Sequence, residues 1–182
     1  FWTPPVAEAV SKRFILLDLC GAFALAAAFR ALFLAVIPPL LDSADALMYL
    51  DAAKAIGAGR LSEVGPRVPL LYPLIAGTLH GVGISAEIAC RAVSLVFGVL
   101  LVIPLYLLAL RMFGRSPARI AVVAVALWPW LADWSGRIAP ESTALLLWFS
   151  GVYLLLRAVD GRRWAMWTAP VIYFALHLAR PE

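Results

Sequence analysis

Charged residues are scarce in this sequence, where they make up 14% of the chain. Soluble globular domains carry about 25% charged residues, and about 45–50% of their residues are apolar. Here 64% of the residues are apolar. The scarcity of charge excludes an ordinary soluble enzyme and a disordered chain, and it indicates a polytopic membrane protein.

Cysteine and histidine are also rare, with two residues of each. Two cysteines are too few for a disulfide-rich scaffold, and we expect both Cys20 and Cys90 to be buried packing residues. HExxH, CxxC and GxGxxG motifs are lacking, so no local signature supports metal hydrolysis, thiol redox chemistry or Rossmann-type nucleotide binding. No run of basic residues alternates with aromatics, and we therefore expect no nucleic-acid partner despite the net charge of +4.

Long apolar runs give the predicted architecture. An α-helix rises 1.5 Å per residue, so crossing about 30 Å of hydrocarbon takes about 20 residues. The clearest such run, Ala92–Leu110, contains no charge. The sequence predicts an all-α, polytopic membrane domain over residues 1–182, with five spans and no signal peptide. The predicted spans are 14–41, 89–112, 117–134, 138–158 and 163–180.

The positions of the basic residues predict the orientation of these spans. Three groups of basic residues flank them, and the positive-inside rule places all three groups in the cytoplasm. The proline-rich run Val68–Val82 then cannot cross the membrane, and we expect it to form a re-entrant or interfacial helix in an outer loop, 42–88. The N-terminus is predicted to be cytoplasmic. The three groups are Lys12 with Arg13, then Arg111, Arg115 and Arg119, then Arg157, Arg162 and Arg163.

Acidic residues gather at the start of that outer loop. In a helix, Asp42 and Asp45 are three positions apart and Asp45 and Tyr49 are four apart, so each pair shares a face, while Asp51 can pair with Lys54. One interpretation is a solvated amphipathic helix whose acidic side chains only face water. The other is that Asp45 is a general base, which takes a proton from a hydroxyl or amine arriving from outside.

Several arginines are predicted to lie on the same side as these acids. An arginine guanidinium is a planar fork that suits phosphate, although for any single arginine the favoured interpretation is an ion pair or extension of the side chain to the membrane surface. Glu141 follows Pro140 and is interpreted either as a helix-start residue or as a site residue. The arginines are Arg30, Arg67, Arg91, Arg137 and Arg180.

Six motifs occur in a familiar order. They are Asp45–Lys54, Pro69–Leu74, Cys90–Leu95, Leu110–Gly114, Arg137–Glu141 and Leu178–Glu182. In order and spacing, this chain resembles the N-terminal part of the C-type membrane glycosyltransferases. The resemblance is to the protein O-mannosyltransferase-like superfamily, which includes the aminoarabinose transferases of lipid A.

The resemblance implies an inverting transferase that moves a sugar from a polyprenyl-phosphate donor to an acceptor on the outer face. Asp45 would be the base, and Arg91 or Arg180 would hold the departing lipid phosphate. No cofactor is expected. Ala46 stands where the family has an acidic residue, which argues against a metal, although a divalent ion stays open. The remaining predicted substrate-binding residues are Asp42, Tyr49, Arg67, Tyr72, Arg137 and Glu141.

The family's members are longer, and the chain begins at Phe1. We therefore expect a fragment of a bacterial inner-membrane enzyme, inactive alone, with membrane lipids and other membrane subunits as partners. An alternative is a non-catalytic scaffold subunit of a larger complex. A transporter or channel is a third possibility, but the sequence lacks the inverted repeats typical of that class.

Overall fold

The computed structural model describes residues 11–37 and 44–180. These residues form α-helices and one short 3-10 helix, with no strand among them, so the predicted all-helical class is confirmed for this part of the chain. The elements are α1 (Lys12–Val36), α2 (Ala44–Gly57), η1 (Leu61–Glu63), α3 (Leu71–Gly81), α4 (Ala86–Leu100), α5 (Val102–Phe113), α6 (Arg115–Ala126), α7 (Pro129–Gly136), α8 (Glu141–Val159) and α9 (Arg163–Ala179).

Three helices are long and apolar enough to cross a membrane within the described ranges. They are α1, the joined pair α4–α5 over Ala86–Phe113, and α8. The joined pair is interrupted at Leu101, since Pro104 has no N–H to donate to the carbonyl of Leu100. With 12 and 17 residues, α6 and α9 are shorter. Helix length thus supports three spans, and the five predicted from the sequence stay a prediction.

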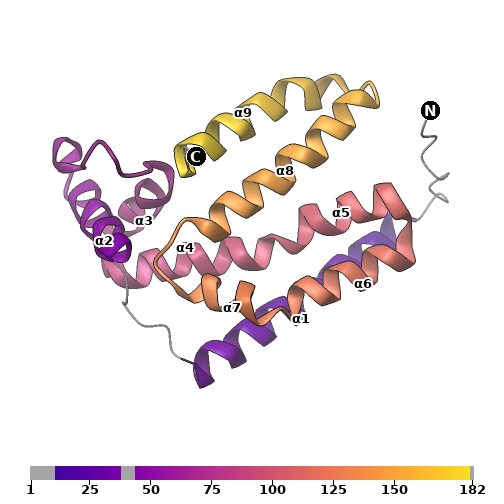
Figure 1. The fold of residues 1–182 in the computed structure, drawn as a ribbon, viewed down its shortest axis with the longest axis horizontal. Coiled ribbons are helices and arrows are strands. Elements are labelled where there is room, and N and C mark those ends of the chain that lie inside the picture. Colours follow the sequence, from indigo (N-terminus) through magenta and orange to yellow (C-terminus); the bar gives the residue numbers. More distant parts are fainter. Residues whose placement is uncertain (1–10, 38–43, 181–182) are drawn as a thin grey trace.

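The helices are arranged so that the chain has two distinct ends (Figure 1). At one end α2 and α3 pack together, α4 and α8 begin, and α9 finishes beside α3. At the other end α1 and α6 begin, α5 finishes, and the turn from α8 to α9 lies nearby. We call these the α2–α3 end and the α5–α6 end. Both turns at the α5–α6 end contain glycine with positive φ, Gly114 at 85° and Gly161 at 78°, a conformation that favours glycine.

Small residues allow the helices to approach closely. A Cβ on Gly77 would lie 2.7 Å from the side chain of Ile56, so glycine is required where α3 crosses α2. A Cβ on Gly98 would overlap Ser135 Oγ, which places α4 against α7. Alanines dominate the buried core on α1, α2 and α6. Close packing of this kind is typical of membrane helices, where apolar burial alone gives little preference for a neighbouring helix over lipid.

The prediction that both cysteines are buried is half wrong. Cys90 is completely buried where α3 and α4 meet, but Cys20 is exposed. Cys20 lies on a part of α1 where Leu16 and Phe23 are exposed as well. The sequence could not distinguish these positions, because lipid-facing and helix-facing sides of a membrane helix are both apolar.

Candidate functional site

The α2–α3 end brings together the residues that the sequence singled out. Asp45 lies in the first turn of α2, Tyr72 in α3 and Arg91 in α4, while Glu141 opens α8 and Arg180 follows α9. The helices that carry them meet at this end of the bundle (Figure 1). Asp42 lies outside the described residues, so its predicted place beside Asp45 is untested.

Asp45 and Tyr49 differ in their surroundings, although both lie on α2. Asp45 is exposed, whereas Tyr49 is only 8% exposed and packs edge-on against Tyr72, with ring centroids 5.6 Å apart. The predicted pairing of Asp51 with Lys54 is confirmed, with Oδ1 and Nζ 3.1 Å apart. Asp51 is thus occupied by a neighbouring cation, while Asp45 is open to a molecule that approaches α2.

Tyr72 is a buried link between helices. Its hydroxyl donates to the carbonyl of Cys90 at 2.8 Å and lies 3.0 Å from Ser94 Oγ. Ser94 in turn donates to the carbonyl of Ala139 at 3.1 Å. Burial raises the pKa of Tyr72 well above its usual value, so the hydroxyl keeps its proton. Tyr72 therefore joins α3 to α4 and, through Ser94, to the segment before α8.

Two arginines fix the same region from other sides. Arg91 donates through Nε and Nη2 to Glu87 Oε1, at 3.0 and 2.9 Å, and through Nη1 to the carbonyl of Gly136 at 2.9 Å. The last contact satisfies a carbonyl at the end of α7. Arg137 donates to Asp133 Oδ2 at 2.8 Å, and its guanidinium lies 5.5 Å from the centre of the Trp134 ring. Both arginines thus hold α7 and the segment that leads into α8.

A pocket of about 250 Å³ lies between α7, α8 and α9. Trp130 and Trp148 supply aromatic surface, and Glu141 and Arg180 supply the charge. Arg180 Nη1 donates to Glu141 Oε1 at a long distance of 3.5 Å, and the Arg180 side chain is 44% exposed. A cavity with apolar walls and a cation at its edge suits a molecule that carries both a phosphate and a hydrocarbon chain.

A second pocket, of about 470 Å³, lies between α2 and the segment before α3. Arg67 lines it from that segment, and Met48, Ala52 and Ala55 line it from α2. These three α2 residues follow Asp45 by three, seven and ten positions, which is one face of a helix. Asp45 therefore lies at the end of the helix face that forms one wall of this pocket.

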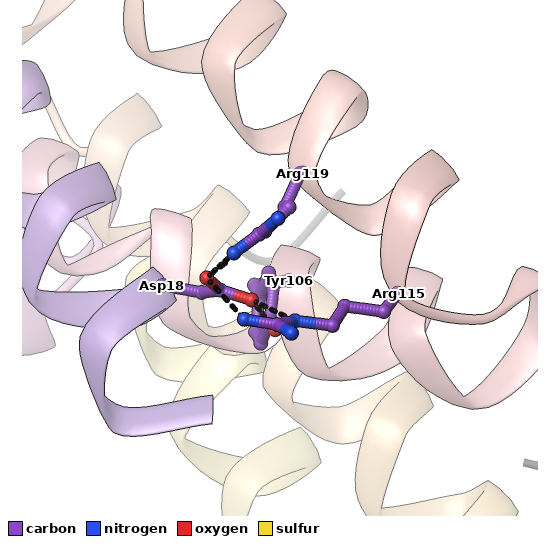
Figure 2. Close-up of polar contacts among 4 residues, drawn as sticks. All are labelled: Asp18, Tyr106, Arg115 and Arg119. Carbon is purple, nitrogen blue, oxygen red and sulfur yellow. Dashed lines mark hydrogen bonds and ion pairs between the residues drawn. The ribbon is translucent and has the colours of Figure 1, made fainter. Parts of the chain in front are cut away.

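A further charged cluster, which sequence reasoning missed, lies at the α5–α6 end. Asp18 accepts a hydrogen bond from Tyr106 at 2.7 Å, and it accepts from Arg115 at 2.8 and 3.1 Å and from Arg119 at 2.9 and 2.6 Å (Figure 2). It joins α1 to α5 and α6. An acid within the first apolar run was a signal for it, since ionisable residues in membrane helices usually have a partner.

Arg30 makes a second set of contacts between helices that the sequence did not predict. Its side chain is completely buried and donates through Nε to Ser135 Oγ at 3.0 Å and through Nη1 to the carbonyl of Ala126 at 3.3 Å. It therefore connects α1 to the end of α6 and to α7. Among the described residues, no group of three or more histidine, cysteine or acidic side chains is placed to hold a metal ion.

The comparisons with known proteins give one match. Residues 67–179, more than half of the chain, match a family model described as dolichyl-phosphate-mannose-protein mannosyltransferase. No curated protein and no solved structure matches the chain. The matched segment includes Arg67, Tyr72 and Arg91, whereas Asp45 precedes it and Arg180 follows it.

Proposed function

Because the chain belongs to the dolichyl-phosphate-mannose-protein mannosyltransferase family, we propose that it is the N-terminal membrane portion of a glycosyltransferase with a polyprenyl-phosphate sugar donor. The protein is an integral membrane protein, and membership of this family makes a membrane glycosyltransferase its activity class. The donor, the acceptor side, inversion and the catalytic base are the parts that we propose beyond the family.

The observation that carries the proposal is the convergence at the α2–α3 end. An exposed carboxylate, Asp45, and an exposed guanidinium, Arg180, lie on helices that meet there through α3. Each borders a pocket or the helix face that leads to one. Transfer from a phosphate-linked donor needs a base for the acceptor and a cation for the leaving group, and this end offers both.

The chemistry follows from those two roles. Asp45 takes the proton from the acceptor hydroxyl or amine, whose oxygen or nitrogen attacks the anomeric carbon of the sugar. The bond from that carbon to the phosphate oxygen breaks on the opposite side, so the configuration inverts. Negative charge develops on the departing lipid phosphate, and a fixed guanidinium stabilises it most in the transition state. Of the two arginines predicted for this role, Arg180 is favoured because it lines the pocket that has tryptophan walls.

The two pockets divide the substrates. The pocket beside Arg180 has tryptophan walls and suits the phosphate and first isoprene units of the donor. The larger pocket beside Arg67 continues the face of α2 that begins at Asp45, and it suits the acceptor.

The orientation in the membrane is also part of the proposal. All three basic groups lie at or near the α5–α6 end, which the positive-inside rule assigns to the cytoplasm. The α2–α3 end then faces outward, in agreement with the predicted cytoplasmic N-terminus and the predicted outer loop 42–88. Together α6 and α7 span residues 115–136, and α9 runs the same way after the turn at Gly161, so we propose these as the two further spans.

Substitution of Arg180 tests this assignment. Arg180→Gln in the full-length protein should raise the KM for a polyprenyl-phosphate sugar and weaken product inhibition by polyprenyl phosphate, each by about tenfold, because a charge-assisted contact to phosphate is lost. Arg163→Gln is the matched control, since Arg163 lies on the same helix at the opposite end and is exposed. Equal effects of both substitutions would show that Arg180 does not bind the donor phosphate. Absence of transfer from every polyprenyl-phosphate sugar would favour the scaffold alternative.

A further inference from the structure

A groove that the proposed reaction does not use runs between α1 and α6 near the α5–α6 end. Its volume is about 300 Å³. Asp18 and Arg119 lie at one end of it, and Leu25 and Val123 lie farther along the two helices. Both helices begin at the α5–α6 end and run in the same direction (Figure 1), so the charged residues lie closest to that end. The groove is therefore amphipathic along its length.

The charged end of the groove has a surplus positive charge. Asp18 is a single carboxylate shared by two guanidinium groups, and its side chain is only 5% exposed. Arg115 is further held over the ring of Phe14, 4.4 Å from the ring centre. The side chain of Arg119, in contrast, is 53% exposed while it contacts Asp18 (Figure 2). Arg119 is thus the cation of this cluster that a second anion can reach.

The apolar part of the groove is open to the surroundings of the protein. A Cβ added at Gly21 would meet no atom within 4 Å, so nothing in the described structure fills this space. Because α1 is long and apolar enough to span a membrane, a groove on its surface is placed to face lipid. An acyl chain in such a groove would supply the dispersion contacts that a void beside apolar side chains lacks.

We propose that this groove binds one anionic phospholipid. Its acyl chain lies along Leu25 and Val123, past Gly21, and its headgroup phosphate accepts hydrogen bonds from Arg119. Asp18 is six residues after the start of α1, about 9 Å along the helix, which is close to the depth of the headgroups when α1 begins at the membrane surface. This site is independent of the proposed transferase reaction, which uses the opposite end of the bundle.

Charge complementarity selects an anionic lipid over a zwitterionic one. A zwitterionic headgroup brings a phosphate together with a cation, and that cation meets the surplus charge of the two arginines. Lys12 and Arg13 begin α1 at the same end and add to the positive potential there. An anionic lipid brings the phosphate without that cost, so the preference concerns the headgroup and not the acyl chain.

Native mass spectrometry of the full-length protein with phosphatidylglycerol and phosphatidylcholine tests the proposal. The wild type should retain phosphatidylglycerol about fivefold better, the preference expected for one arginine near a lipid surface. Arg119→Gln should abolish that preference, and Gly21→Leu should reduce retention of both lipids because leucine fills the groove. Ala24→Leu, an exposed position on α1 that does not line the groove, and Arg163→Gln, an exposed arginine elsewhere, should leave retention unchanged.

Three results would overturn the proposal. The first is equal retention of the two lipids by the wild type. The second is an equal effect of Arg119→Gln and Arg163→Gln, because the preference would then follow net charge alone. The third is displacement of the lipid by inorganic phosphate, which would show a free-phosphate site. Arg119 also contacts Asp18, so thermal unfolding of Arg119→Gln is measured alongside. If that variant unfolds, the test is the comparison of lipid retention in Gly21→Leu and Ala24→Leu, because Gly21 has open space around it and can accept the larger side chain. Equal retention in these two variants would then overturn the proposal.

Discussion

Asp18 is predicted to be the most important polar contact for holding α1 in the bundle. It accepts five hydrogen bonds from three side chains on α5 and α6 (Figure 2), and its own side chain is 5% exposed. In Asp18→Asn the carboxylate becomes an amide, which keeps one acceptor oxygen and turns an N–H₂ donor towards the guanidinium groups. Two positive charges then lie together with no neutralising acid.

The size of the effect follows from burial. Removing one partner of a buried ion pair costs about 3–5 kcal/mol. The arginines here are partly exposed, Arg115 at 26% and Arg119 at 53%, and both can turn towards water or headgroups. We therefore expect Asp18→Asn to lower the free energy of unfolding by about 2–3 kcal/mol. Arg119→Gln leaves Asp18 with Arg115 and Tyr106, and should cost about 1 kcal/mol or less.

Equilibrium unfolding in detergent micelles, followed by far-UV circular dichroism, measures both free energies. Asp51→Asn is the control, because it breaks an exposed pair with Lys54 and should change the free energy of unfolding by less than about 0.5 kcal/mol. A loss of unfolding free energy in Asp18→Asn no greater than that in Asp51→Asn would contradict this prediction. It would mean that the cluster contributes no more than a surface ion pair.

Two further predictions concern packing and pH. Gly98→Ala should destabilise the protein by about 1–3 kcal/mol, since its methyl group would overlap Ser135 Oγ. Gly21→Ala should stabilise the protein by about 0.5–1 kcal/mol, because Gly21 has open space around it and alanine favours a helix. Equal shifts of the thermal unfolding midpoint in the two variants would contradict this prediction. The Arg111 guanidinium, 2.9 Å away, holds the pKa of Asp160 below its usual value. The folded protein therefore binds a proton at Asp160 less readily than the unfolded chain, and this contribution to stability is lost as the pH falls below about 4. In Asp160→Asn the unfolding midpoint should depend less on pH in that range. A pH dependence equal to that of the wild type would contradict this prediction.

Local sequence patterns predicted local structure well. The proline-rich run 68–82 predicts a re-entrant or interfacial helix; α3 at Leu71–Gly81 confirms the helix, while its place at the membrane surface stays a prediction. The spacing of Asp51 and Lys54 predicted their ion pair. In both cases the relevant interactions lie within one helix, where residue spacing fixes which side chains meet.

Contacts between distant segments could not be predicted in the same way. Asp18 and Arg119 are 101 residues apart, and Arg30 and Ser135 are 105 apart, so no spacing rule connects them. The burial of Tyr72 could not be predicted either. An aromatic residue in an outer loop suggests a substrate contact, and only the structure shows that Tyr72 packs against α4. The sequence thus indicated which residues carry charge or hydrogen-bonding groups, but not which of them are already occupied by other parts of the protein.

The proposed role of Asp45 as the base of a glycosyl transfer can be tested by a single-turnover measurement. Full-length wild type, Asp45→Asn and Asp160→Asn are each loaded with a labelled polyprenyl-phosphate sugar and mixed with acceptor. We predict that Asp45→Asn binds the donor normally but transfers the sugar about 10²–10⁴-fold more slowly, the usual contribution of a general base. Asp160→Asn, at the α5–α6 end and paired with Arg111, should react like the wild type. Equal transfer rates for Asp45→Asn and the wild type would exclude Asp45 as the base.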